Sequence, residues 1–482
     1  MKTANTGNDF NISMGDINKD ILKLAVPSIL ANITVPLVGL VDMSVAGHLV
    51  PGDSMQAASL IGGIAVGTML FDLLYWNFGF LRAGTGGLAA QAYGRGDDKA
   101  AGRILTRAVG LAMLSSVVLI AIQWLFVKGA FLFVDCSPEV EALASGYFFI
   151  RIWAAPATLS LMALKGWFIG MQDGISPMAT DLAVNVINAV SSIVLALGIH
   201  AGAVSFDGIG FSGIAWGTVI AQYTGLAVAM VIIFSRYRER LKGTFKARYL
   251  LLAFSGEGAG QFFRLNRDLF IRSLCLICIY IGFTSIAASY GDLILAVASV
   301  LMKLMMLFSY FTDGFAYAGE ALAGKSIGEK DPVALRISVS CVHAWSIFLM
   351  VLSVVAYAFG TMPMVGLMTD DSSVVDLSDS YVPWLIAMPA IGCAAFTWDG
   401  IYIGATAVKP MRNAMLLSTV AFFGAYLVCM AVKGSEGDEF LQGRTALHGL
   451  LFGYLLHLAV RFVYLTAAYG KEVLPKAVPE QR

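Results

Sequence analysis

The sequence predicts an all-α integral membrane protein, with twelve transmembrane helices in two pseudo-symmetric six-helix lobes around a central cavity. Three observations lead to this fold class. Of 482 residues, 58% are hydrophobic and only 13% are charged, against roughly 25% charged in soluble domains. Twelve apolar runs can cross a hydrocarbon core of roughly 30 Å, which takes about 20 helical residues. A residue pattern also recurs between the two halves of the chain.

The predicted spans follow one another along the whole chain, separated by short polar connections. The second span is expected to continue as a helix to about residue 92. In chain order the spans are 21–49, 56–82, 104–127, 142–170, 178–200, 212–235, 269–289, 293–322, 337–360, 382–404, 413–432 and 447–469.

Basic residues in the loops are one-sided. The loop between the sixth and seventh spans is rich in Lys and Arg, whereas the alternate loops 51–55, 200–211 and 369–381 contain neither. Because Lys and Arg accumulate on the cytoplasmic side of a membrane, both termini are predicted to be cytoplasmic. We therefore expect a multi-pass protein of the cell (inner or plasma) membrane.

The recurring pattern divides the chain. The stretch LAAQAYGRGD, Leu88 to Asp97, returns as LAGKSIGEKD, Leu322 to Asp331, at an offset of 234 positions. Each half holds six spans, so the halves start on the same side and form parallel lobes with a cavity between them. The predicted organisation is 1–20 cytoplasmic N-terminal segment, 21–235 N-lobe, 236–268 basic cytoplasmic inter-lobe loop, 269–470 C-lobe and 471–482 cytoplasmic tail.

A carboxylate near the centre of a membrane helix costs about 2.5–3.5 kcal/mol on insertion scales, so each one needs a partner or a proton. Asp42 lies in the outer half of the first span. The fifth span carries a polar stripe whose members are spaced i, i+4, i+7 and i+11 from Asp181, on one helical face. The side chains expected near the depth of Asp42 are Asn188, Ser192 and, on the sixth span, Thr218.

Other charges inside the spans leave two interpretations open: a cavity lined by carboxylates, or buried salt bridges. Lys303 is expected to pair with a carboxylate, and as a positive charge near the cavity it puts a purely cationic substrate in question. Arg82 is expected to snorkel to the interface, and Glu320 to reach the cytoplasmic interface. The candidate cavity residues are Asp72, Asn185, Lys303, Asp313 and Asp399.

Two prolines precede Asp42 on the first span. Pro27 and Pro36 each remove a backbone hydrogen bond and can start a bend. Both static kinks and a hinge coupled to Asp42 fit this pattern.

Several segments resemble the multidrug and toxic compound extrusion (MATE) family, in particular its DinF-like branch. They are AVPSILANITVPLVGLVDMSVAGHL from Ala25, FGFLRAGTGG from Phe78, AQAYGRGD from Ala90, TDGFAYAGEALAGKSIG from Thr312 and WDGIYIGA from Trp398. The likeness extends over nearly all of the chain. It implies cation-coupled alternating access and efflux of cationic or amphipathic organic compounds.

The resemblance also implies a site for the coupling cation. The family uses an Asp on the first span, an Asn and a second Asp on the fifth, and a Thr on the sixth; here these positions hold Asp42, Asn188, Ser192 and Thr218. Ser192 thus replaces the second carboxylate. A proton needs Asp42 alone, so proton coupling is favoured, while sodium at Asp42, Asn188 and Thr218 remains the alternative.

Other functional classes lack support. There is no phosphate-binding loop and no H-E-x-x-H, and the His residues are scattered, so neither an enzyme nor a cofactor is expected. The zero net charge argues against nucleic-acid binding. We expect a monomeric antiporter with the lipid bilayer and a small organic substrate as partners. A flippase for a lipid-linked saccharide is the alternative, which would favour a strongly basic cavity.

Overall fold

The computed structural model describes residues 14–49, 54–132, 134, 136–201, 204–242, 258–369, 371–433 and 439–479. Within these ranges, twelve helical segments are long and apolar enough to cross a membrane, which confirms the predicted number of spans. The first half contains α1 (Met14–His48), α2 (Ser54–Trp76), α3 (Gly79–Gly94), α4 (Asp98–Ala130), α5 (Pro138–Arg151), η1 (Ile152–Ala154), α6 (Ala155–Gly170), α7 (Ile175–Leu197), β1 (Ile199–Ala201), β2 (Val204–Phe206) and α8 (Phe211–Arg236). The second half contains α10 (Ala259–Ala288), α11 (Asp292–Glu329), α12 (Pro332–Met368), α13 (Ser372–Asp379), α14 (Val382–Gly404), α15 (Val408–Lys433), α16 (Glu439–Glu472) and η2 (Leu474–Ala477).

Some helix boundaries differ from the prediction. The second span is not one helix: it breaks after α2, where the Asn77 side chain donates to the Leu73 carbonyl at 3.0 Å and the Phe78 amide to the Tyr75 carbonyl at 2.9 Å. These bonds close a tight turn before α3 begins. α10 starts at Ala259, inside the predicted inter-lobe loop. The loop residues 243–257 and the N-terminal residues 1–13 lie outside the described ranges.

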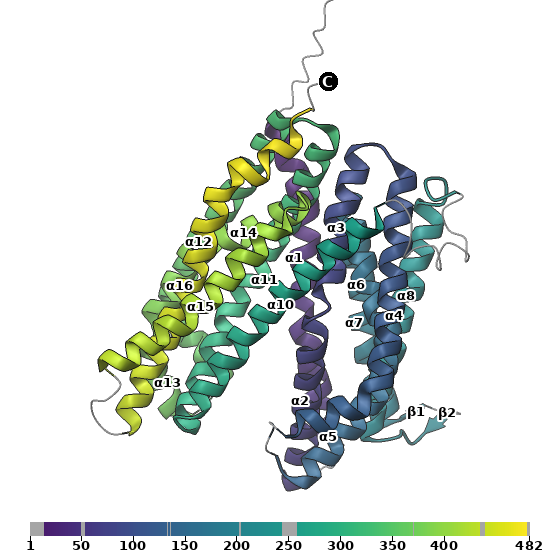
Figure 1. The fold of residues 1–482 in the computed structure, drawn as a ribbon. Helices are drawn as coiled ribbons and strands as arrows, with labels where there is room; N and C mark the ends of the chain where they lie inside the picture. The colour runs from purple at the N-terminus through teal and green to yellow at the C-terminus, as the bar shows by residue number, and fades with distance from the viewer. Residues whose placement is uncertain are drawn as a thin grey trace, which may run out of the picture.

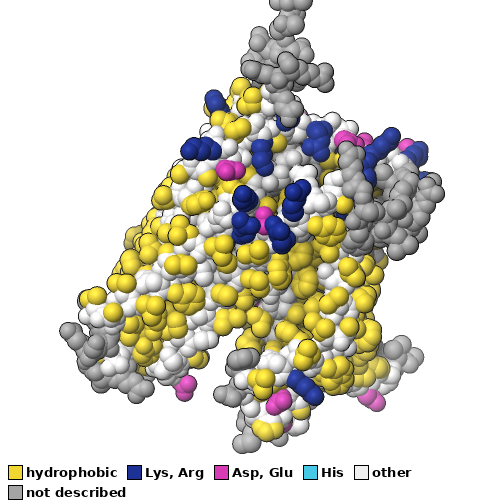
Figure 2. Space-filling view, in the orientation of Figure 1, with side chains coloured by type: hydrophobic (Ala, Val, Ile, Leu, Met, Phe, Trp, Pro, Cys, Tyr) yellow, Lys and Arg dark blue, Asp and Glu magenta, His cyan; other side chains and the backbone are white. Residues whose placement is uncertain are grey.

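Figure 1 shows two helical bundles that meet at one end and separate toward the other. We call α1 to α8 the N-lobe and α10 to α16 the C-lobe. The antiparallel pair β1–β2 and the short helix α13 lie where the bundles are apart. In Figure 2, most Lys and Arg of the visible face gather near the end where the lobes meet, and a notch separates the lobes at the other. We call these the closed end and the open end.

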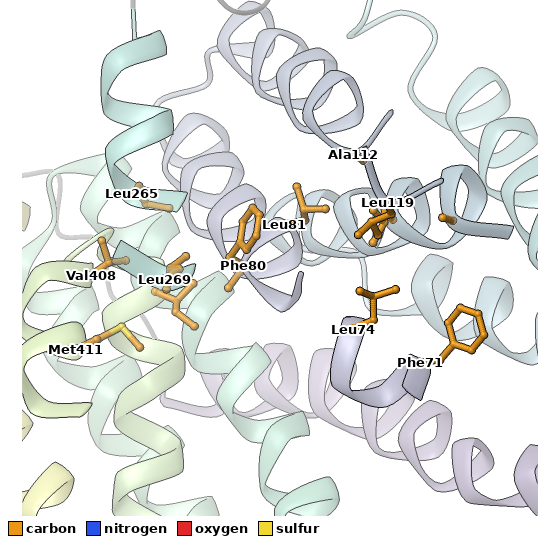
Figure 3. Packing of buried hydrophobic residues seen from close by; sticks show 14 of the residues in the cluster. Phe71, Leu74, Phe80, Leu81, Ala112, Leu119, Leu265, Leu269, Val408 and Met411 are labelled. Atoms are coloured by element: carbon orange, nitrogen blue, oxygen red, sulfur yellow. The ribbon is translucent and has the colours of Figure 1, made fainter. Parts of the chain in front are cut away.

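The closed end contains a hydrophobic core that joins the two lobes. Figure 3 shows Phe80 and Leu81 of α3 beside Leu265 and Leu269 of α10. All four side chains are buried, and the ring of Phe80 also meets Phe270 edge-on at 5.9 Å. Burial of apolar area on both sides therefore stabilises lobe contact at this end.

The repeated sequence forms the seam between the lobes. A Cβ atom on Gly94 of α3 would lie 2.1 Å from the carbonyl oxygen of Lys325, and one on Gly328 of α11 would lie 2.3 Å from that of Gln91. The two contacts are related by the offset of 234 positions found in the sequence. Only glycine permits this approach, so the repeat encodes a pseudo-two-fold packing of α3 against α11.

The last residue of each repeat, Asp97 or Asp331, caps the helix that follows it. Asp97 accepts a hydrogen bond from the Ala100 amide at 2.9 Å, and Asp331 accepts one from the Ala334 amide at 2.9 Å. Each aspartate thus caps the following helix, α4 or α12, by satisfying an amide that has no partner within the helix.

Candidate functional site

The polar residues predicted at the depth of Asp42 lie together in the N-lobe. Asp42 of α1 is 5% exposed, and Asn188 and Ser192 of α7 and Thr218 of α8 are also buried. Ser192 Oγ lies near the Asp42 carboxylate and interacts with it, and Asn188 Nδ2 donates to Thr218 Oγ1 at 3.0 Å. The i, i+4 spacing of α7 presents both of its side chains to the same space.

Close packing of α7 against α8 gives the site its shape. A Cβ atom on Gly217 would lie 2.6 Å from Ser192 Oγ. The missing side chain at Gly217 lets the two helices approach and brings Thr218 to Asn188. Three residues before Asn188 on the same face of α7, Asn185 Nδ2 donates to Thr34 Oγ1 of α1 at 2.5 Å, so the polar stripe faces α1 at this level too.

Two buried oxygens of this site lack a hydrogen-bond partner in the part of the chain that the structure describes. Among the described residues, buried Asp42 Oδ1 and Asn188 Oδ1 have no hydrogen bond. Buried polar atoms in folded proteins are nearly always paired, and each exception calls for an explanation. A proton on the carboxylate, or a small cation between the two oxygens, would supply the missing interaction.

Sequence reasoning missed a cation beside this site. Arg151, at the end of α5, attracts both Asp42 and Asp72 and donates from Nη1 to the Tyr147 hydroxyl at 3.0 Å. Its guanidinium also lies over the Phe71 ring, 4.7 Å from the centroid. Tyr147 in turn interacts with Thr218. The only signal in the sequence was a single Arg within the apolar span 142–170.

The predicted hinge lies on α1, the helix that carries Asp42. α1 is helical from Met14 to His48, through both Pro27 and Pro36. Pro27 is partly buried, and the side chain of Pro36 lies outside the described residues. Bending of α1 at these prolines stays a prediction.

The C-lobe carboxylates are divided between two environments. Asp399 of α14 forms ion pairs with Arg272 of α10 and Arg461 of α16. It is therefore part of a buried salt bridge, as one of the two interpretations proposed. Asp313 of α11 is partly exposed and has no ion pair within 4.0 Å in the described chain, although Arg82 attracts it.

The expectation for Arg82 and Glu320 was wrong. Arg82 of α3 does not snorkel: its Nη1 lies 3.0 Å from Glu320 Oε2 of α11, and its guanidinium lies over the Tyr317 ring. Glu320 is fully buried, because α3 and α11 enclose it between the lobes. The ion pair thus joins the N-lobe to the C-lobe next to the glycine-lined seam.

Lys303 and Asp72 lie on different lobes and influence one another electrostatically. Both side chains are exposed, Asp72 on α2 and Lys303 on α11. Lys303 attracts Asp72, but no ion pair within 4.0 Å joins the two in the part of the chain that the structure describes. Asp72 is thus a carboxylate whose charge Lys303 influences.

The geometry can be compared with known proteins. The MatE family model matches residues 27–196 and 269–427. The chain is 33% identical over 405 residues to DNA damage-inducible protein F of Escherichia coli (strain K12), covering 84% of each chain. It is 24% identical to the probable multidrug resistance protein NorM of Rhizobium meliloti (strain 1021), over 65% of this chain and 64% of that one.

Solved structures agree with the fold. A crystal structure of the eukaryotic MATE transporter AtDTX14 superposes with a TM-score of 0.78 at 17% identity, covering 96% of this chain and 98% of that one. A crystal structure described as MATE in the bent conformation gives a TM-score of 0.79 at 15% identity, with the same coverage. These neighbours confirm the two-lobe, twelve-helix architecture.

Proposed function

Because the chain belongs to the MatE family, whose members are efflux transporters and not enzymes, we propose that it exports amphipathic or cationic organic compounds as a proton-coupled antiporter. The relatives named for multidrug resistance support the substrate class. The observation that supports the coupling ion is the buried Asp42 carboxylate, which is attracted by Arg151 and has one oxygen with no hydrogen bond among the described residues.

The neighbours of Asp42 favour a proton over sodium. A sodium ion would have to be held by the oxygens of Asp42, Asn188 and Thr218 while the guanidinium of Arg151 repels it. A proton needs no coordination shell, and it removes the desolvation cost of the buried carboxylate by neutralising it. Ser192, in place of a second carboxylate, leaves less negative charge to hold a metal ion.

The arrangement of the two lobes, which meet at one end and separate at the other like a V, supports the proposal of alternating access. We infer that the closed, basic end faces the cytoplasm and that the open end faces outward. Protonation of Asp42 from outside would weaken its long-range attraction for a positively charged substrate and its interaction with the polar stripe of α7, and the substrate would leave through the open end. The seam of α3 and α11 would then open toward the cytoplasm.

The flippase alternative is less well supported. A strongly basic cavity would suit the anionic headgroup of a lipid-linked saccharide, whereas here Asp72 lies on the N-lobe opposite Lys303. The mixture of charges fits small organic compounds better. A monomer remains our proposal for the oligomeric state.

The proposed orientation predicts a labelling pattern. In a background without the native cysteines, a membrane-impermeant thiol reagent should modify Ser373→Cys in intact cells. It should modify Lys242→Cys only after the cells are permeabilised, since both side chains are exposed but lie at opposite ends. Labelling of position 242 in sealed cells would reverse the orientation.

Transport by the purified protein in lipid vesicles tests the function. Export of a cationic xanthene dye should be driven by an imposed proton gradient and not by a sodium gradient of the same size. Sodium-driven export at the same rate, with no response to protons, would contradict proton coupling. Absence of dye movement under either gradient would contradict export itself.

A further inference from the structure

Resting on the proposed export function, we propose that Lys303 and Asp72 form a two-pole binding site for zwitterionic amphipathic substrates. Lys303 receives an anionic group of the substrate, such as a carboxylate, and Asp72 receives its cationic group. The aromatic ring system of the substrate would lie between these two charged side chains. The substrate class is thereby narrower than cationic or amphipathic compounds in general.

The position of Lys303 follows from its neighbours on α11. Asn32 of α1 donates to the carbonyl oxygen of Tyr310 at 3.2 Å, so this face of α11 meets the N-lobe. Lys303 lies seven residues earlier on the same helical face. Because Lys325 of α11 lies in the seam at the closed end, Lys303 lies further toward the open end, where the lobes separate.

Asp72 is placed by a similar argument on α2. The ring of Trp76 contacts that of Tyr280 on α10, with centroids 5.1 Å apart, so this face of α2 meets the C-lobe. Asp72 precedes Trp76 by four residues and shares its face. Its exposed carboxylate therefore points toward the space between the lobes.

The two charges attract each other across a gap. Lys303 influences Asp72 electrostatically, yet within the described ranges Lys303 has no ion pair and no hydrogen bond. Arg151, the other cation near Asp72, already donates to the Tyr147 hydroxyl and also attracts Asp42. Lys303 is thus the cation that remains available to a ligand.

The surroundings determine which ligand suits both charges. The aromatic residues Trp76 and Tyr280 lie beside Asp72, and they offer flat apolar surface to a ring system. A ligand with only positive charge would be repelled by Lys303, and one with only negative charge by Asp72. A zwitterion satisfies both poles.

A matched pair of dyes tests this inference in lipid vesicles that contain the full-length protein. One is a cationic xanthene with a free carboxylate, and the other is its methyl ester. Lys303→Met should raise the KM for the free-acid dye about tenfold, because a charge-assisted contact is lost. The KM for the ester should not rise, and it should fall to the extent that Lys303 repels a purely cationic dye. Lys303→Arg should keep export of the free acid.

One control variant makes the result specific. Lys409→Met removes an exposed lysine of α15 and should leave the KM for both dyes unchanged. If Lys303→Met raises the KM for both dyes equally, or leaves the KM for the free acid unchanged, the two-pole site is overturned. Continued export of the ester in that case would leave the proposed export function intact. If the wild type exports neither dye under a proton gradient, the export function itself is overturned.

Discussion

Asp42→Asn is expected to reduce proton-driven dye export to the background of vesicles without protein. Asparagine has nearly the shape of a protonated aspartate, so it keeps the contacts with Ser192 but cannot release or accept a proton. It also removes a buried charge, and the folded state should be at least as stable as the wild type. Export in lipid vesicles and the thermal unfolding midpoint of the purified protein measure these two effects.

A suitable control is Asp292→Asn, which removes an exposed carboxylate at the start of α11. It should export dye at the wild-type rate. If Asp42→Asn also exports at that rate with an unchanged need for protons, the Asp42 site is structural. The coupling residue would then have to be sought among Asp72, Asp313 and Asp399.

Gly87→Ala is expected to prevent the lobes from meeting at the closed end. A Cβ atom at this position of α3 would lie 2.1 Å from the backbone oxygen of Ile403 on α14. Because a backbone carbonyl within a helix cannot turn aside, the helices must separate, at a cost of about 1–3 kcal/mol for overpacking. The state in which the closed end is joined and the open end is apart should become less populated, and the rate of dye export should fall.

Spin labels across the open end can detect this shift. With labels at Glu141 of α5 and Ser373 of α13, Gly87→Ala should move the distance distribution to shorter values as the open end closes. Gly79→Ala on the same helix is the matched control, since a Cβ there has nothing within 4 Å. Unchanged distances and full export in Gly87→Ala would refute the role of the seam.

The sequence was most informative where a pattern is local. Apolar length predicts the spans because a helix must cover the hydrocarbon core by itself. The spacing of Asn188 and Ser192 predicts their common face because helical periodicity is a property of one segment. The repeat of residues 88–97 at 322–331 could be recognised in the sequence. The close contact that it forms, between Gly94 and the carbonyl of Lys325, could be seen only once the helices were packed together.

Pairings between distant helices could not be predicted in this way. Arg82 and Glu320 are 238 positions apart, and each alone looks like an interfacial charge. Arg151 bonds Tyr147 on its own helix, but the carboxylates that it attracts, Asp42 and Asp72, come from other helices. Its link to Asp42 exists only because α1, α5 and α8 surround the same space.

Proton release on substrate binding tests most directly whether Asp42 exchanges a proton for substrate. The free-acid xanthene dye is added to purified protein in weak buffer, and the change in pH is recorded with the wild type and with Asp42→Asn. We predict that the wild type releases protons in proportion to bound dye and that Asp42→Asn binds dye without releasing them. Equal release from both proteins, or none from the wild type, would contradict the proposed coupling at Asp42.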